Sequence, residues 1–210
     1  MDRRTLLLTP LAALLAPSAR AQVQPAPLTA QDQADLARVQ AYLNSIHTLK
    51  ARFLQVAPTG QVSEGTAWVD RPGRMRFEYA NAPFVLIAGH GILVFRDKQL
   101  NQTSNLPLGS TPLGILLAPT VQLVGGDVTI VRIDRQPGQL QLTVVRTASP
   151  GDGSLTLVFS DNPLALRQWI VVDAQHKETR VSLYDVQLGG SFSDELFNVA
   201  RPEQEPPSIR

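Results

Sequence analysis

The sequence predicts a mainly β protein with a few helices, built around one large antiparallel sheet. From Leu49 onward, apolar and polar residues alternate for most of the chain, which is the period of a half-buried strand. Short turn sequences rich in Gly, Pro, Asn and Asp separate these segments, and connections this short join only antiparallel neighbours. The length of 210 residues suits one domain with a substantial core.

Segment 1–21 predicts a cleavable export signal. Arg3 and Arg4 precede an apolar run from Leu6 to Ala16, and Ala19-Arg20-Ala21 places small residues where a signal peptidase cleaves. The run is too short to span a hydrocarbon core of about 30 Å. We therefore expect export to the periplasm and cleavage after Ala21, with both the general secretory and the twin-arginine route open.

The remaining chain, 22–210, is expected to be a single soluble domain. It has no cysteine, so it has neither a disulfide nor the acylated cysteine that would anchor it to a membrane. The whole chain carries 19 basic and 18 acidic side chains, a balance that indicates no nucleic-acid-binding face. We expect a monomer, structured over 28–200 and followed by a Pro-rich tail at 201–210.

The first predicted element is an amphipathic helix. Thr29 and Asp32 have the spacing of a capping box at its start. An apolar stripe then follows at helical spacing, formed by Leu36, Val39, Leu43 and Ile46. This stripe must lie on another apolar surface.

The next elements are strands. One begins at Leu49, and the others are predicted at 61–70, 74–80, 84–88, 92–96, 128–133, 139–146, 154–160, 164–173 and 178–188. Within 74–80, Met75, Phe77 and Tyr79 share one face while the intervening residues are charged, so one face of the sheet is expected to be apolar and the other wet. A sheet of about ten strands normally curls or closes, and its concave face is filled, covered or left as a ligand cavity.

A long insertion, 97–127, supplies a second candidate to cover that face. Thr111 can cap a short apolar helix, and Pro119 ends it. The residues predicted to form this helix are Pro112, Leu113, Ile115, Leu116 and Leu117. Insertions of this length are usually functional lids or disordered. A fixed plug in the core and a movable cover both remain open.

The sequence shows no pattern of catalytic or metal-binding chemistry. His47, His90 and His176 lie in different segments without a second ligand at metal spacing. There is no nucleophile elbow, phosphate loop or dinucleotide fingerprint. Trp68 and Trp169 could stack on a sugar or a base, but in half-buried strands they are more often packing residues. We therefore expect no enzymatic activity, no cofactor and no metal.

Five short motifs together resemble those of the periplasmic outer-membrane lipoprotein carrier family, LolA type. In chain order they are Phe53-x-Gln55, the run Trp68–Tyr79, Thr111-Pro112-Leu113, Asn162-Pro163-Leu164 and Leu196-Phe197. The resemblance covers nearly the whole chain after the predicted signal. The family's membrane-anchored acceptor relatives need a lipidated cysteine, which this chain lacks.

The resemblance implies an unclosed antiparallel half-barrel of about 10–11 strands, covered by a helical lid. Its apolar hollow would hold the acyl chains of lipoproteins on their way from the inner to the outer membrane. The implied partners are acylated lipoproteins, an inner-membrane lipoprotein-releasing ABC transporter and an outer-membrane acceptor. Arg71 matches the family's basic residue that fastens the lid. Without the resemblance, its position in a turn would indicate an ordinary solvent-exposed arginine. Phe77 departs from the pattern, because many members have Trp there.

The hollow is expected to be lined by the apolar faces of the helix and the strands, namely Leu36, Val39, Leu43, Ile46, Phe53, Met75, Phe77, Tyr79 and Phe95, together with the predicted cover helix. Another class of function is a regulatory module that uses the same fold to sense lipoproteins or lipids. A chain without a hollow would indicate a structural domain. A nucleophile and a base within the hollow would indicate an enzyme acting on lipid.

Overall fold

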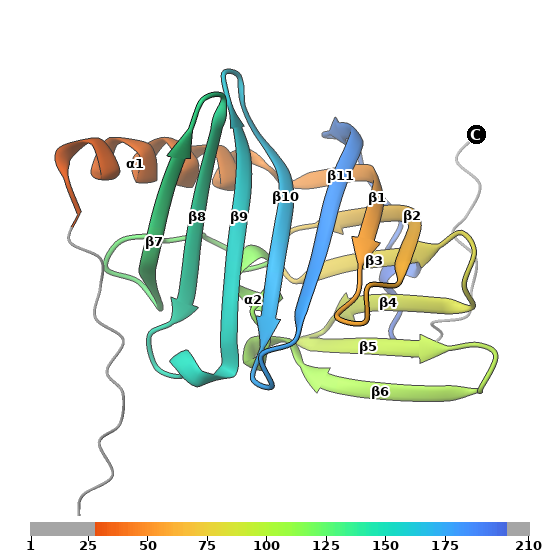
Figure 1. Ribbon diagram of the computed structural model, residues 1–210. Coiled ribbons are helices and arrows are strands. Elements are labelled where there is room, and N and C mark those ends of the chain that lie inside the picture. The colour runs from red at the N-terminus through yellow and green to blue at the C-terminus, as the bar shows by residue number, and fades with distance from the viewer. Residues whose placement is uncertain (1–27, 201–210) are drawn as a thin grey trace, which may run out of the picture.

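The computed structural model describes residues 28–200, so the predicted signal at 1–21 and the tail at 201–210 lie outside it. Its centre is one 11-stranded antiparallel sheet in the order β6-β5-β4-β3-β2-β1-β11-β10-β9-β8-β7 (Figure 1). The strands are β1 (Thr48–Val56), β2 (Val62–Asp70), β3 (Arg74–Tyr79), β4 (Phe84–Gly89), β5 (Ile92–Asp97), β6 (Gln102–Pro107), β7 (Val128–Gln136), β8 (Gln139–Arg146), β9 (Gly153–Asp161), β10 (Leu164–Asp173) and β11 (Glu178–Leu188). This confirms the predicted fold class.

The sheet is unclosed, and its two edges are consecutive in the sequence. Every strand pairs with the next one along the chain except β6 with β7, while β1 and β11 pair with each other. The segment between the two edges, 108–127, therefore has to connect opposite sides of the open sheet. This connection carries the predicted cover.

Strand β6 was not predicted, because the sequence placed it inside the long insertion. All six of its residues are exposed, so its sequence lacks the alternation that identifies a half-buried strand. Its backbone nevertheless pairs with β5 along its whole length, from Asp97 with Gln102 to Ile92 with Pro107. The insertion is correspondingly shorter than expected.

Helix α1 (Ala30–Ser45) is capped by Thr29, and both hydrogen bonds of the predicted capping box are present. The helix lies across one end of β7–β10 (Figure 1). The Tyr42 hydroxyl accepts a hydrogen bond from the backbone N–H of Leu166 at 3.0 Å, and its ring meets that of Phe159 edge-on at 6.0 Å. The apolar stripe of α1 thus joins the core of this part of the sheet.

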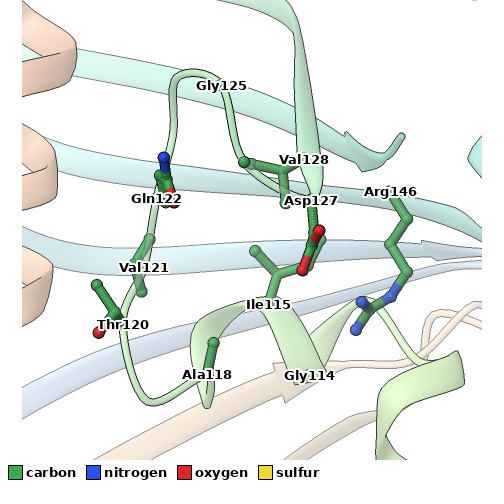
Figure 2. Close-up of a pocket in the computed structure, with 11 residues that line it drawn as sticks. Gly114, Ile115, Ala118, Thr120, Val121, Gln122, Gly125, Asp127, Val128 and Arg146 are labelled. Carbon is green, nitrogen blue, oxygen red and sulfur yellow. The ribbon is translucent and has the colours of Figure 1, made fainter. Parts of the chain in front are cut away.

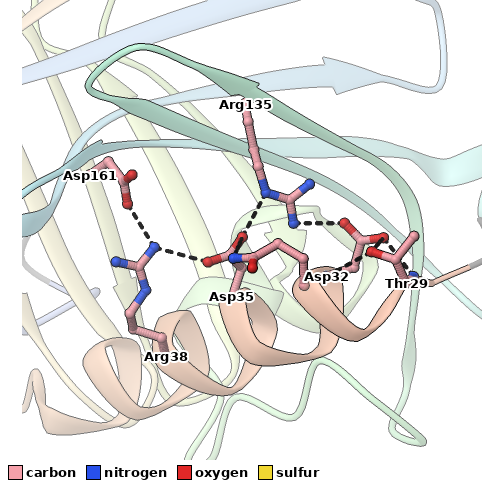
Figure 3. A network of polar contacts seen from close by, with 7 residues as sticks. Thr29, Asp32, Asp35, Arg38, Arg135 and Asp161 are labelled. Carbon is pink, nitrogen blue, oxygen red and sulfur yellow. Dashed lines mark hydrogen bonds and ion pairs between the residues drawn. The ribbon is translucent and has the colours of Figure 1, made fainter.

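A network of ion pairs holds the start of α1 to the sheet (Figure 3). Arg135 on β7 contacts Asp32 and Asp35, each at 2.7 Å. Arg38 contacts Asp35 at 3.0 Å and Asp161, the last residue of β9, at 2.6 Å. Hydrogen bonds from the backbone and hydroxyl of Thr29, and then from Arg135, lower the pKa of Asp32 to about 2. The carboxylate therefore stays charged at neutral pH.

The predicted cover is built from two short turns of helix. A 3₁₀ turn, η1 (Leu108–Ser110), precedes α2 (Leu113–Leu116). Thr111 was expected to cap the helix, but its hydroxyl instead donates to the carbonyl of Leu108 at 2.9 Å, and Pro112 takes the capping position. Competition from this local bond explains why α2 starts one residue later than predicted. Segment 108–123 is called the cover below.

The convex face is not uniformly wet, which corrects the simple two-face prediction. On its outer side, β2 carries Trp68, which packs with Phe197 of the 3₁₀ turn η3 (Asp194–Phe197). Arg76 is 1% exposed on the same face, pairs with Glu78 and donates to the carbonyl of Leu196 at 3.2 Å. The C-terminal segment therefore buries part of the sheet's outer face.

Candidate functional site

The concave face contains an apolar cavity of about 260 Å³, called the hollow below. Its wall comes from the strands on the β6 side of the sheet, from β10 and β11, and from Leu113 of the cover. The lining residues are Gln55, Met75, Phe77, Tyr79, Leu86, Phe95, Leu113, Trp169, Val171, Thr179 and Val181.

The hollow has a deep end and an outer end. Met75, Phe77 and Trp169 are 1–2% exposed and form the deep end. Phe95 is 37% exposed, and Tyr79 is half-buried. The hollow thus runs from a deep end to a partly exposed end.

Aromatic rings form a continuous wall between these two ends. The ring of Phe77 meets that of Trp169 at 5.9 Å, and Phe53 then meets Phe77 at 4.7 Å and Tyr79 at 5.2 Å. Phe84 continues the series, with ring distances of 6.2 Å to Tyr79 and 5.4 Å to Phe95. Such edge-to-face and tilted contacts hold large apolar surfaces in fixed orientations.

The structure divides the residues that the sequence assigned to the hollow into two groups. Met75, Phe77, Tyr79 and Phe95 line it, as does Leu113 of the cover. The others lie in the adjoining core rather than at the hollow, namely Leu36, Val39, Leu43, Ile46, Phe53, Leu116 and Leu117. The division follows from the position of α1, which packs against the β7–β10 half of the sheet.

Several lining residues were not singled out from the sequence. Leu86 belongs to β4, whose apolar run does not reveal which side chains point inward; the register, Phe77 opposite Leu86, settles it. Val181 and Trp169 occupy inward positions in alternating strands and are directly paired between β11 and β10. The alternation predicts that these two side chains point inward. It does not predict that they lie away from α1 and therefore at the hollow.

Arg71, in the turn between β2 and β3, bridges α1 and the cover. Its Nη1 donates to the carbonyls of Leu43 and Ile46, the latter at 3.3 Å. Its Nε and Nη2 donate to the carbonyl of Ala118 at 3.3 and 2.7 Å. Burial lowers the pKa of the Arg71 guanidinium. The guanidinium lies half-buried against the carbonyls at the end of α1 and at the end of α2, where the last carbonyls of a helix lack partners in the following turn.

Side chains of α1 also hold the last part of the cover. The Asn44 amide donates to the carbonyl of Val121 and accepts from its N–H, both at 2.9 Å. The Gln40 side chain accepts from the N–H of Leu123 at 2.8 Å. These bonds, with those of Arg71, tie residues 118–123 to the helix.

A second cavity, of about 320 Å³, separates the cover from β7 and β8 (Figure 2). Ile115 and Ala118 border it from the cover, Val128 and Arg146 border it from β7 and β8, and Asp127 borders it just before β7. Arg146 donates to the carbonyl of Thr111 at 3.1 Å. The cover is thus closely packed on the side of Arg71 and more loosely packed on the side of Arg146.

The hollow contains no catalytic constellation. None of its lining residues is a histidine, cysteine, serine, aspartate or glutamate, so no nucleophile meets a base there. Within residues 28–200, no group of three or more metal-ligating side chains is found. No helix in the same range combines the length and the apolarity needed to cross a bilayer.

An open antiparallel sheet with an apolar hollow beneath a hydrogen-bonded cover defines a covered β half-barrel. The family model described as "Outer membrane lipoprotein carrier protein LolA" matches residues 44–200, and the chain belongs to this family. A protein of Chromohalobacter salexigens named "Outer-membrane lipoprotein carrier protein" is 27% identical, over 84% of this chain and 88% of that protein.

Two solved structures are similar at low identity. A DUF1329 family protein from Desulfovibrio piger has a TM-score of 0.49 and 8% identity, covering 82% of this chain and 98% of its own. A LolA superfamily protein from Nitrosomonas europaea has a TM-score of 0.42 and 11% identity, covering 79% of this chain and 98% of its own.

Proposed function

We propose that the protein is a periplasmic carrier that binds the acyl chains of lipoproteins in the hollow and ferries them from the inner to the outer membrane. The observation that carries the proposal is the covered hollow itself: an apolar cavity whose cover is held by separable hydrogen bonds from Arg71. Family membership and the name of the Chromohalobacter relative support the same reading.

The hollow is small for its proposed cargo. Its volume of about 260 Å³ falls below the roughly 300–1,000 Å³ of ordinary ligand pockets. The proposal therefore includes a movement of the cover away from the sheet when an acyl chain binds. Arg71 is proposed as the latch of this movement, because its guanidinium joins the cover to α1 by hydrogen bonds rather than by apolar packing.

A latch matters because an open hollow would bind too tightly. Burying about fifteen methylenes at ~0.8 kcal/mol each is worth about 12 kcal/mol, which corresponds to nanomolar binding. A carrier must also release its cargo. A cover that is fully hydrogen-bonded when closed competes with the acyl chain and lowers the apparent affinity by the free energy of opening.

The proposed route needs an exported, unanchored protein and two partners. Export would depend on segment 1–21, with cleavage after Ala21. The partners would be a lipoprotein-releasing ABC transporter at the inner membrane and an acceptor at the outer membrane, with acylated lipoproteins as cargo. The family is a carrier family rather than an enzyme family.

Uptake of a fluorescent acylated peptide tests the proposal. Phe77→Glu or Leu113→Glu should abolish uptake, because both side chains line the hollow and a carboxylate facing lipid is left unpaired or must take a proton. The matched control is Leu54→Glu, at a side chain that is 36% exposed outside the hollow. Unchanged uptake by folded Phe77→Glu and Leu113→Glu proteins would place the ligand elsewhere. Tight uptake without transfer to any acceptor would favour a sensor of acylated proteins.

A further inference from the structure

The outer end of the hollow is polar, although the rest of its wall is apolar. Three side chains from three strands meet the cavity there: Gln55 of β1, Tyr79 of β3 and Thr179 of β11. All three are half-buried, whereas the deep-end residues Met75 and Phe77 are almost fully buried. A saturated hydrocarbon alone gives no reason for polar groups at this position.

A hydrogen bond joins Tyr79 to the oxygen of the Gln55 amide, so the NH₂ group of that amide can still donate to a ligand. The hydroxyl of Tyr79 donates to Oε1 of Gln55 at 2.9 Å. The NH₂ group of the same amide carries two donors that can bind a ligand oxygen. Among residues 28–200, no hydrogen bond donated by Nε2 of Gln55 is found.

The state of Tyr79 suits this arrangement. Burial raises the pKa of Tyr79 to about 12, against the opposing effect of its hydrogen bond to Gln55. The phenol therefore keeps its proton at neutral pH and remains a donor to Oε1 of Gln55. Its ring is fixed between Phe53 and Phe84 by edge-to-face contacts at 5.2 and 6.2 Å, so the hydroxyl has a defined position.

We propose that this outer end is a subsite for the carbonyl of an acyl ester or amide, in which the Gln55 amide donates to the carbonyl oxygen and Tyr79 positions the amide. The hydrocarbon then extends from the subsite toward Met75, Phe77 and Trp169. Thr179, on the opposite side of Gln55, supplies a hydroxyl for a neighbouring oxygen of the lipid head. The inference rests on the proposed lipid-binding function and adds a polar contact that selects acyl groups over plain alkyl chains.

The subsite predicts the orientation of the ligand as well as its chemical class. Placing the carbonyl at the half-buried Gln55 leaves the attached head group at the outer end, where a protein moiety could remain outside. The reverse orientation would bury a carbonyl among aromatic and aliphatic side chains without a partner, which is unfavourable.

Binding of two matched ligands to the full chain tests the subsite. One is a long-chain fatty acid methyl ester, and the other is an alkyl methyl ether of the same length, which lacks the carbonyl. The wild type should bind the ester about 3- to 10-fold more tightly than the ether, the range expected for one net hydrogen bond. Gln55→Met, which keeps the side-chain length, should lose this preference while binding of the ether is unchanged.

Two further variants complete the design. Tyr79→Phe keeps the ring but removes the hydroxyl, so it should reduce the ester preference less than Gln55→Met does, and it serves if Gln55→Met does not fold. Gln168→Leu is the matched control, because the Gln168 amide bonds to Ser182 on the opposite face of the sheet at 3.0 Å. It should leave the preference intact.

The outcomes separate the two proposals. Equal binding of ester and ether by the wild type, or an ester preference that survives in Gln55→Met, would overturn the subsite while leaving the carrier function in place. Failure of the wild type to bind either ligand would overturn the carrier function, and the subsite with it.

Discussion

The two halves of the concave face have the same inward alternation of apolar residues but are filled differently. On β7–β10, aliphatic side chains such as Leu142, Leu155 and Leu157 are at most 1% exposed and pack with the stripe of α1 in a single cluster. On the β3–β5 side, aromatic side chains surround a cavity of about 260 Å³. The same alternation of inward apolar residues therefore gives a packed core where α1 covers the sheet and a hollow where α1 does not.

The two elements that cover the concave face, α1 and the cover, are also attached to the rest of the protein by different polar contacts. The start of α1 is held to the sheet by apolar packing and by the ion pairs of Arg135 with Asp32 and Asp35. The end of the cover also packs into the core, through Val121 and Leu123, but its polar attachments are hydrogen bonds to its backbone, from Arg71 and from side chains of α1. The polar attachments of α1 are thus ion pairs between side chains, and those of the cover are hydrogen bonds to backbone groups.

The largest expected effect contrasts one leucine from each half. Leu157→Ala should lower the free energy of unfolding by about 2–5 kcal/mol, because it opens a new cavity in the packed half. Leu86 is half-buried and borders a cavity that already exists. Leu86→Ala should therefore cost only about 1–2 kcal/mol, the free energy of removing the lost methyl groups from water. Urea denaturation of both variants measures the difference. Equal losses would mean that the two halves are packed alike.

A second prediction breaks the latch. Arg71→Leu should destabilise the closed empty form but not the acyl-bound form, so acyl-peptide affinity should tighten by about 1.5–3 kcal/mol, roughly tenfold or more. Transfer to an acceptor protein should slow. Arg52→Leu is a suitable control, since Arg52 is an exposed arginine paired with Glu64 outside the hollow.

Weaker acyl binding by Arg71→Leu, with equal or faster transfer, would mean that Arg71 contacts the cargo itself. Unchanged binding and transfer would show that it has no part in holding the cover. Either result would remove the latch from the account while leaving the hollow as the proposed site.

A third prediction concerns a substitution that fills the hollow, so that this half of the concave face resembles the packed half. Phe77→Trp should fill part of the cavity and raise the free energy of unfolding by about 0.5–2 kcal/mol, as cavity-filling substitutions commonly do. Acyl-peptide binding should weaken at the same time, because the ligand competes for that space. Thermal unfolding and binding are measured on the same protein. Tighter binding together with unchanged stability would place the acyl chain away from Phe77.

The smallest expected effect concerns the ion pairs at the start of α1. The pKa of Asp32 is lowered from 3.8 to about 2 in the folded protein, so the stability it contributes is present above pH 3.8 and is lost as the pH falls through about 2. Asp32→Asn should therefore flatten the dependence of the melting temperature on pH between these values. An equally steep dependence in the variant would assign acid sensitivity to other carboxylates.

Most of the fold could be predicted from the sequence, and the reasons for the exceptions are physical. The alternating strands and the capping box of α1 are local patterns, and the structure contains them close to the expected residues. Strand β6 could not be found, because an exposed edge strand needs no apolar alternation. The shortened helix α2 depends on the bond from Thr111 to Leu108, which competes with the expected cap.

The candidate site was predictable only in part. Met75, Phe77 and Tyr79 stand out by alternation on one strand, and the resemblance drew attention to Arg71. The separation of hollow from core depends on where α1 lies along the sheet, which its own sequence does not specify. Gln55 was part of a recognised motif, but its bond to Tyr79 joins residues on different strands and has no local signature.

The two tryptophans of the chain allow the most direct test of the central claim that acyl chains enter the β3–β5 half. Trp169 lines the hollow, whereas Trp68 lies beneath the C-terminal segment on the convex face. The measurement is fluorescence quenching by a brominated acyl ligand in the single-tryptophan variants Trp68→Phe and Trp169→Phe, with binding verified by calorimetry. The account predicts strong quenching of Trp169 and little of Trp68. Quenching of Trp68, or bound ligand that leaves Trp169 unquenched, would contradict it.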